Sequence, residues 1–229
     1  MSQEDAKQAA ALKAAEFVES GMIVGLGTGT TARYFIDRLI EKAKDGLSIQ
    51  VVASSKESAD RAKKGKLKVR ELNDVTHVDL TVDGADEIDP QKRMIKGGGG
   101  ALVREKILGY ASHELMIIVD ETKCRPRLGH VKLPVEVIFY GSPSTRRRIE
   151  KLGLSPTWRM KEDRTLFVTD NGNLILDVTL PSTPFSPEEL HEQIKAIPGV
   201  VDTGFFFGIA GRVIVGQFSG AVDLSRFST

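Results

Sequence analysis

Cysteine is almost absent from this sequence, with Cys124 the single one among 229 residues. One cysteine cannot form an intrachain disulfide, and a chain without disulfides is typical of a reducing compartment, so we expect a cytoplasmic protein. The four histidines are scattered along the chain and do not group with the cysteine as zinc ligands would. The sequence therefore predicts no metal site.

An excess of charge of one sign is also lacking, because 32 Lys and Arg residues stand against 31 Asp and Glu. Binding to nucleic acid or to a membrane surface needs concentrated positive charge, so we expect neither partner. The one basic cluster, Arg146, Arg147 and Arg148, is more typical of a solvated or subunit-contact face.

Long apolar runs are missing as well, and no stretch approaches the roughly 20 residues that span a bilayer. Residues 1–20 carry acids and lysines among alanines, which is unlike a secretory signal. We expect no membrane association.

The first 120 residues instead alternate short apolar strands with helices. Strands are expected at residues 22–24, 49–53, 78–83 and 115–119, and helices precede or separate them, the last beginning near residue 99. This alternation is typical of right-handed βαβ units. The sequence predicts an α/β protein with a Rossmann-like, mostly parallel sheet flanked by helices.

The pattern changes after residue 129. Strand, helix, two strands, helix and strand follow one another between residues 134 and 207, with a hairpin turn at Asn171 and Gly172, and this order is typical of a ferredoxin-like module. Residues 212–216 are expected to rejoin the first sheet. We therefore predict a smaller ferredoxin-like α+β domain at 131–207, inserted before the last strand of a Rossmann-like catalytic domain formed by 1–130 and 208–229.

Residues 25–31, Gly-Leu-Gly-Thr-Gly-Thr-Thr, lie between a predicted strand and a predicted helix. Glycines let the backbone approach an anion, and the helix N-terminus and the threonine hydroxyls supply donors. A dinucleotide fingerprint needs a third glycine where Thr30 stands, and residues 50–54 offer no acid for a ribose. The loop therefore favours a monophosphate, with a tight turn that binds nothing as the alternative.

Residues 83–89 hold Asp83, Asp86, Glu87 and Asp89 at the carboxyl end of a predicted strand, where open α/β sheets place ligands. The spacing does not fit an EF-hand, and no His or Cys lies nearby to complete a zinc site. An acid/base pair with shifted pKa values and a solvated acidic turn both stay open.

Lys96 precedes four consecutive glycines, residues 97–100. Glycines in such a run permit close backbone approach to a ligand, and their amides together with Lys96 would form a positive pocket suited to a developing oxyanion.

Glu105 follows this run on a predicted helix. The residues three or four positions away share its face, and all are small or apolar: Ala101, Leu102, Leu108 and Gly109. Desolvation on such a face raises the pKa of a carboxyl group toward neutrality, as proton abstraction from carbon requires. The alternative is a surface glutamate paired with basic neighbours, which would need a polar face.

Two lysines have weaker signals. Lys123 follows a predicted strand and is as consistent with a solvated loop residue as with a contact to phosphate or sugar. Lys7, one turn into the first helix, is either a contact to the phosphate loop or a surface lysine.

Taken together, these blocks resemble ribose-5-phosphate isomerase, type A, over nearly the whole chain. The resemblance is carried by residues 25–31, 82–87, 96–99 with 104–106, 133–137, 169–173 and 197–200, in that order and spacing. It implies an intramolecular oxidoreductase that interconverts D-ribose 5-phosphate and D-ribulose 5-phosphate through an enediolate, in the non-oxidative branch of the pentose phosphate pathway.

The resemblance also implies roles for individual residues. Glu105 matches the proton-transferring base, and Asp83 and Lys96 match residues for ring opening and enediolate stabilisation. The expected substrate contacts are Thr28, Gly29, Thr30, Thr31, Asp83, Gly84, Ala85, Asp86, Lys96, Gly97, Gly98, Gly99, Lys123 and Lys7. The family implies no cofactor or metal, a small sugar phosphate as the partner, and a homodimer or homotetramer.

Two other functions compete with this one. A non-catalytic sugar-phosphate sensor would keep the phosphate loop but would not need Glu105 on an apolar face. A nucleotide-dependent oxidoreductase is disfavoured by Thr30 and by the missing ribose-reading acid.

Overall fold

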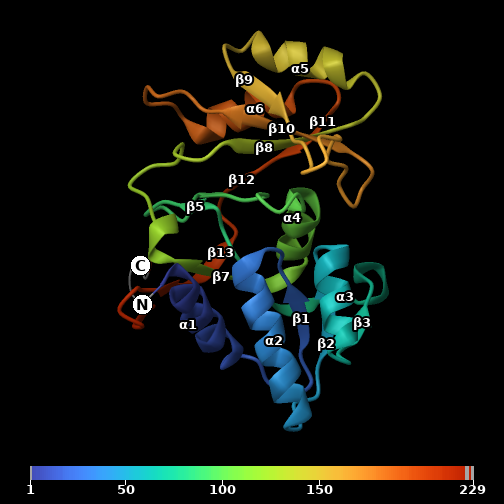
Figure 1. Cartoon of the computed structure of the whole chain (residues 1–229), viewed down its shortest axis with the longest axis vertical. Helices are drawn as coiled ribbons and strands as arrows, with labels where there is room; N and C mark the ends of the chain where they lie inside the picture. The colour runs from blue at the N-terminus through green and yellow to red at the C-terminus, as the bar shows by residue number, and fades with distance from the viewer. Residues whose placement is uncertain (1, 225–226, 228–229) are drawn as a thin grey trace.

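The computed structural model describes residues 2–224 and 227, which form two tiers of secondary structure (Figure 1). The helices are α1 (Gln3–Ala15), α2 (Thr30–Lys44), α3 (Lys56–Lys64), α4 (Leu102–Tyr110), α5 (Ser142–Glu150) and α6 (Pro187–Lys195), with 3-10 helices η1 (Leu72–Asp74) and η2 (Glu121–Lys123). The strands are β1 (Ile23–Leu26), β2 (Gln50–Ala53), β3 (Lys68–Arg70), β4 (Val78–Asp83), β5 (Glu87–Ile88), β6 (Met94–Ile95), β7 (Ser112–Asp120), β8 (Leu133–Val137), β9 (Ser155–Trp158), β10 (Leu174–Thr179), β11 (Val200–Thr203), β12 (Phe205–Phe206), β13 (Ala210–Gly216) and β14 (Val222–Asp223).

The lower tier contains a seven-stranded sheet in the order β14-β13-β7-β4-β1-β2-β3. All neighbouring strands are parallel except β13 and β14, so the predicted mostly parallel sheet is confirmed. The chain runs outward from β1 to β2 and β3, and then crosses back to β4 on the other side of β1. This reversal between β1 and β4 is the point at which open α/β sheets bind ligands, outside the carboxyl ends of the strands.

Alternating side chains on β7 explain why helices cover both faces of this sheet. Met116 and Ile118 pack with buried residues of α1, α2 and α3, whereas Ile117 and Val119 pack on the opposite face with Leu102 of α4. Successive side chains of a strand point to opposite faces, and fully burying one such side chain stabilises the fold by about 1.5–3 kcal/mol.

Serine side chains cap the starts of three helices. Ser2 and Asp5 form a reciprocal capping box at α1, and the side chains of Ser55 and Ser186 accept hydrogen bonds from backbone amides at the starts of α3 and α6. These bonds satisfy amides that would otherwise lack a partner. Helix α4 begins at Leu102, three residues later than expected from the sequence.

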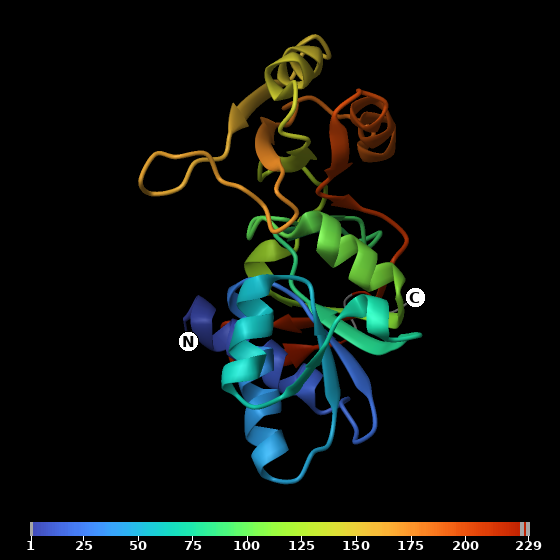
Figure 2. The same ribbon diagram turned by 90° about the vertical axis from the view of Figure 1, so that its right-hand side faces the viewer.

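The upper tier holds a four-stranded antiparallel sheet in the order β11-β8-β10-β9. Helices α5 and α6 follow β8 and β10 in the chain, so the element order and strand order are those of the predicted ferredoxin-like module. Residues of α5 and α6 bury one face of the sheet, whereas α4 of the lower tier contacts β8 and β11 (Figure 2).

The predicted turn at Asn171 and Gly172 is confirmed, because the amide of Thr169 donates to the carbonyl of Asn173 and an antiparallel bridge joins Val168 with Leu174. The regular antiparallel partners of β10 are β8 and β9, whereas residues 165–169 before the turn form single bridges, Met160 with Leu166 and Val168 with Leu174. The turn at residues 169–173 also contacts α4 and α3, through Arg104 and the amide of Lys56. The predicted last strand at 200–207 is split into β11 and β12.

A three-stranded antiparallel sheet, β12-β6-β5, lies between the tiers and was not expected from the sequence. Its strands are two residues long, too short to show any periodicity. Strand β6 leads directly into Lys96, so this small sheet positions the start of the glycine run.

After the upper tier, β13 rejoins the large sheet parallel to β7, as expected, and β14 then adds an antiparallel edge strand that was not anticipated. The domain limits at residues 130/131 and 207/208 stay a prediction, and residues 225, 226, 228 and 229 of the predicted 208–229 segment lie outside the described part. None of the helices at residues 2–224 is long and apolar enough to cross a membrane.

Candidate active site

A pocket opens where the strand order reverses, at the carboxyl ends of β1 and β4. It gathers every residue proposed from the sequence except Asp83. Its lining residues are Lys7, Thr28, Gly29, Thr30, Thr31, Gly84, Ala85, Asp86, Lys96, Gly97, Gly98, Gly99, Glu105 and Lys123. Segments that lie as far apart as α1 and η2 in the sequence thus meet at one site.

The loop between β1 and α2 forms one side of the pocket. Gly29 is the N-cap of α2 with φ of 101°, and no side chain caps the helix there. The amides of the first turn therefore remain available to an anion, and the helix dipole favours negative charge at this end. A side chain at Gly27 would place its Cβ 2.0 Å from Oδ1 of Asp83, so only glycine lets this loop pack against β4.

Lys7 and Lys123 add positive charge to the same pocket. Lys7 projects from α1 and is largely buried, with its Nζ 2.7 Å from Oε1 of Glu4. Lys123 ends η2, whose N-cap is Asp120 at the end of β7. The burial of Lys7 contradicts a solvated surface lysine, whereas Lys123 is partly exposed, so both alternatives for Lys123 stay open.

Asp83, Lys96 and Glu105 form a buried charged cluster beside the pocket. Lys96 Nζ lies 2.8 Å from Oδ2 of Asp83 and 3.4 Å from Oε2 of Glu105, and it also donates to the backbone carbonyl of Gly84. Oδ1 of Asp83 accepts hydrogen bonds from the amides of Thr28 and Gly84. One ammonium group is therefore paired with two carboxylates, and that of Asp83 is the nearer one.

This arrangement sets the protonation of the cluster. Burial opposes charge on Lys96, but the carboxylates of Asp83 and Glu105 outweigh burial and raise the pKa of Lys96 above its ordinary value. Burial raises the pKa of Glu105 to about 8, and the charge of Lys96 offsets this only in part. At neutral pH the cluster thus holds a lysine cation and a glutamate poised near its titration point.

The predicted apolar face around Glu105 is confirmed. Glu105 is 3% exposed, and Leu102, Leu108 and Gly109 on the same face of α4 are buried with it. Its Oε2 atom accepts no hydrogen bond from residues 2–224. The alternative of a surface glutamate paired with basic neighbours is therefore wrong.

The two basic residues beside Glu105 anchor α4 to the upper tier. Arg104 donates through Nε to Oδ1 of Asn171 at 2.8 Å, and Lys106 donates to the carbonyl of Thr203 at 2.9 Å and pairs with Asp202. Because these side chains project to either side of the helix, Glu105 between them faces the pocket.

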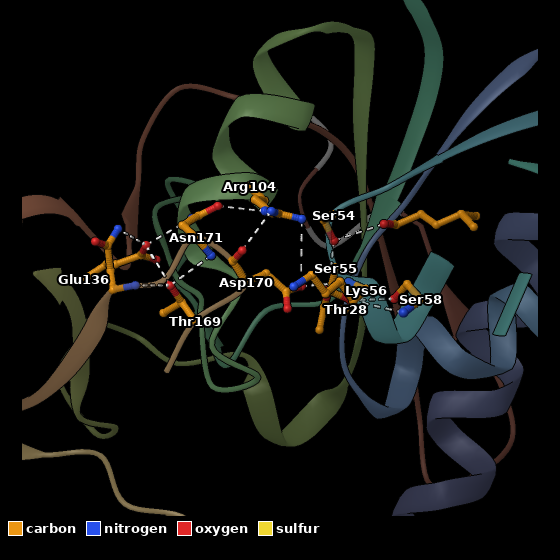
Figure 3. Close-up of polar contacts among 12 residues, drawn as sticks. Thr28, Ser54, Ser55, Lys56, Ser58, Arg104, Glu136, Thr169, Asp170 and Asn171 are labelled. Carbon is orange, nitrogen blue, oxygen red and sulfur yellow. Dashed lines mark hydrogen bonds and ion pairs between the residues drawn. The ribbon is translucent and has the colours of Figure 1, made fainter. Parts of the chain in front are cut away.

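Figure 3 shows how the turn at residues 169–173 connects α4 with the loop between β1 and α2. Asp170 accepts from Arg104 through its backbone carbonyl and from the amide of Lys56, at the start of α3, through its carboxylate. The neighbouring Ser54 and Ser58 in turn bond the loop, Ser54 Oγ to Oγ1 of Thr28 at 2.8 Å and Ser58 Oγ to the carbonyl of Gly27 at 2.7 Å.

The turn itself is held by a buried carboxylate, Glu136 of β8. Its Oε1 atom accepts hydrogen bonds from the side chains of Thr169, Asn171 and Asn173, at 2.8–3.1 Å (Figure 3). The sequence did not predict these contacts of Glu136. It predicted only the hairpin turn at Asn171 and Gly172.

The acidic run at residues 83–89 does not act as one unit. Asp86 lines the pocket and accepts from the amide of Gly98, whereas Glu87 points away and bonds Gly129 and His130. Asp89 is fully buried and paired with Arg93. Of the four carboxylates, only those of Asp83 and Asp86 adjoin the pocket. The burial of Asp83, Glu87 and Asp89 contradicts a solvated acidic turn, and the acid/base pair stays a prediction.

Metal binding was disfavoured from the sequence. Across residues 2–224 and 227, no group of three or more His, Cys, Asp or Glu side chains is arranged to hold a metal ion.

The family model for ribose 5-phosphate isomerase A (phosphoriboisomerase A) matches residues 50–220. The ribose-5-phosphate isomerase A of Protochlamydia amoebophila (strain UWE25) is 43% identical over 219 residues, covering 96% of this chain and 94% of that protein. The protein of the same name from Bacillus mycoides (strain KBAB4) is 45% identical over 214 residues, covering 93% and 96%.

Solved structures agree over nearly the full length. Ribose 5-phosphate isomerase A from Methanocaldococcus jannaschii superposes with a TM-score of 0.90 at 34% identity, covering 98% of this chain and all (100%) of that one. A D-ribose-5-phosphate isomerase in complex with phospho-erythronic acid gives a TM-score of 0.92 at 36% identity, covering 97% and 98%. The chain belongs to the ribose 5-phosphate isomerase A family.

Proposed function

We propose that this protein interconverts D-ribose 5-phosphate and D-ribulose 5-phosphate, with Glu105 as the base that moves a proton between C2 and C1. The observation that carries the assignment is a buried carboxylate with a pKa raised to about 8 that lines the same pocket as an uncapped helix N-terminus. A sensor needs the anion site but has no use for the poised base, so the geometry favours an enzyme.

Substrate binding begins with the phosphate group. The amides at the start of α2 and the hydroxyls of Thr28, Thr30 and Thr31 supply donors, and the ammonium groups of Lys7 and Lys123 supply charge. The phosphate then fixes the sugar chain so that its C1–C2 end lies toward Asp86, Lys96 and Glu105 on the other wall.

Ring opening requires a proton to leave the C1 hydroxyl and another to reach the ring oxygen. The resemblance assigns this step to Asp83, but Asp83 is 1% exposed and lies behind Lys96. We therefore assign Asp83 an indirect part, in which its carboxylate holds Lys96 charged and in place beside the sugar.

Isomerisation of the open chain then needs one base. Glu105 takes the proton from C2, and the C–H electrons form the C1–C2 double bond while charge develops on O1. Lys96 and the glycine amides stabilise this enediolate oxygen. Return of the proton from Glu105 to C1, with transfer of the O2 proton to O1, gives the ketose, so no electron acceptor is consumed.

A coupled assay of ribulose 5-phosphate formation from ribose 5-phosphate tests the function. We expect turnover by the purified protein with a chelator present and without NAD(P). Absence of turnover by folded protein, or turnover that appears only on addition of NAD(P), would show that the proposal is wrong.

The pH dependence of kcat/KM should report the raised pKa of Glu105. A base must be deprotonated to act, so kcat/KM is expected to fall about tenfold per pH unit below the pKa of Glu105 and to level off above it. The substrate phosphate loses its second proton near pH 6 and gives a separate limb, as phosphate esters do. An acid limb only near the ordinary glutamate value of 4.5 would contradict the assignment.

We also propose that the protein is cytoplasmic and forms a homodimer or homotetramer. The single cysteine supports the first statement. The second is supported by the family and by the apolar segment Ile138, Phe139 and Tyr140, whose side chains are 47%, 64% and 91% exposed. A monomeric mass by light scattering at working concentration would refute the oligomer.

A further inference from the structure

Arg159, at the end of β9 in the upper tier, reaches the glycine run of the pocket from behind. Its Nη1 atom donates to two successive carbonyls, that of Gly97 at 2.8 Å and that of Gly98 at 3.0 Å. The side chain is 14% exposed and does not line the pocket. Sequence reasoning gave no role to this residue.

Arg159 is itself held in one orientation. Asp177 of β10 accepts from both Nε, at 3.0 Å, and Nη2, so the pair is bidentate, and the guanidinium also lies 5.9 Å from the ring centroid of Phe167. The carboxylate of Asp177 neutralises the charge of the guanidinium group. Arg159 therefore acts on the pocket through its hydrogen bonds and not through a long-range electric field.

Because the peptide bond is planar, the direction of each carbonyl also fixes the direction of the N–H group in the same peptide. In a trans peptide the N–H points opposite to the C=O, and the described chain has no cis peptide. With the carbonyls of Gly97 and Gly98 turned to Arg159, the amides of Gly98 and Gly99 must point the other way.

The contact made by Gly98 shows that this other direction is the pocket. The Gly98 amide donates to Oδ2 of Asp86 at 2.7 Å, and Asp86, Gly98 and Gly99 all line the pocket. The Gly99 amide makes no hydrogen bond within the described residues and is left facing the same side. It lies in the wall that also holds Lys96 and Glu105.

We propose that Arg159 is a positioning residue that aims the Gly99 amide at the developing enediolate oxygen. A carbonyl that accepts a charge-assisted bond also polarises its peptide, which makes the N–H of the same peptide a stronger donor. The upper tier thereby takes part in the reaction without touching the substrate. This inference rests on the proposed isomerase function.

The test compares Arg159→Ala and Arg159→Lys with Arg146→Ala, a control on an exposed arginine of α5 that pairs with Glu150. We expect Arg159→Ala to lower kcat about 10- to 100-fold with a less than threefold change in KM, below the about 10²- to 10³-fold cost of deleting an oxyanion donor. Arg159→Lys should restore little, because an ammonium group cannot bond Asp177 and both carbonyls in the same geometry. Arg146→Ala should be unchanged.

Two ligands separate positioning from a general loss of structure. Phospho-erythronic acid carries a planar charged carboxylate where the enediolate forms, so its affinity should fall with kcat/KM in Arg159→Ala. Inorganic phosphate, which probes only the anion loop, should bind as in the unaltered protein.

Four results would contradict the proposals. An unchanged kcat in Arg159→Ala, or equal losses of phosphate and phospho-erythronic acid binding, would overturn the positioning role while the unaltered protein still isomerises. If Arg159→Ala does not fold, an unchanged kcat in Arg159→Lys overturns it in the same way. A lack of isomerase activity in the unaltered protein would instead refute the proposed function.

Discussion

Replacing Glu105 with glutamine is expected to lower kcat by about 10²- to 10⁴-fold, the usual worth of a general base. Glutamine keeps the size of the side chain and its place on α4 but cannot accept the C2 proton. Since Glu105 is not the group that holds the phosphate, KM and the affinity for inorganic phosphate should change little. Steady-state kinetics with ribose 5-phosphate and phosphate competition measure both.

Stability provides a second check on Glu105→Gln. The carboxylate is buried, and burial disfavours its charged form, so a neutral amide should leave the free energy of unfolding equal or higher at pH 8 and above, where Glu105 is ionised. Glu150→Gln, on the exposed face of α5, serves as the matched control and should leave kcat unchanged. A Glu105→Gln protein that isomerises at nearly the normal rate would remove Glu105 from the mechanism.

Replacing Lys96 with methionine is expected to lower kcat by about 10²- to 10³-fold, the range found for loss of one oxyanion donor. Methionine preserves much of the length and the apolar stem but removes the charge next to the enediolate. Ground-state binding should weaken much less, because the phosphate site on the opposite wall is intact. Lys96→Ala should show the same ratio of effects.

The same change should move the pH profile. Lys96 lowers the pKa of Glu105, so its loss should shift the acid limb of kcat/KM to higher pH.

The variant leaves Asp83 buried without its cation, which costs stability, so folding must be verified by thermal denaturation. Lys151→Met, at the exposed end of α5, is the control. Equal losses in kcat/KM and in substrate binding, with kcat unchanged, would make Lys96 an anchor for substrate rather than a group that stabilises the enediolate.

The local sequence was enough to predict the main elements and most of the pocket. The alternation of apolar strands with helices identified α1 to α3 and the strands β1, β2, β4 and β7, since these signals come from residues within one or two turns of each other. Short strands such as β5 and β6 gave no signal because two residues have no period, and β12 was predicted only as the end of a longer strand. The turn at residues 169–173 was predicted, but its contacts with α3, α4 and β8 were not, because those partners lie in other elements.

The apolar stripe around Glu105 was a local signal as well, because residues three and four positions apart on a helix share a face. It correctly predicted a buried carboxylate with a raised pKa. The position of the Asp83 side chain does not follow from the local sequence. The sequence predicts it on the pocket surface, but it lies behind Lys96.

By itself the sequence determined which segments are strands and helices, where glycine allows an anion to approach, and which helix face buries a glutamate. Only the tertiary structure decided that a single ammonium group stands between Asp83 and Glu105, and that Arg159, Glu136 and the turn at 169–173 support the pocket from the second sheet. The physical reason is that hydrogen bonds and ion pairs act over about 3 Å in space between residues dozens of positions apart, and no pattern along the chain encodes that meeting.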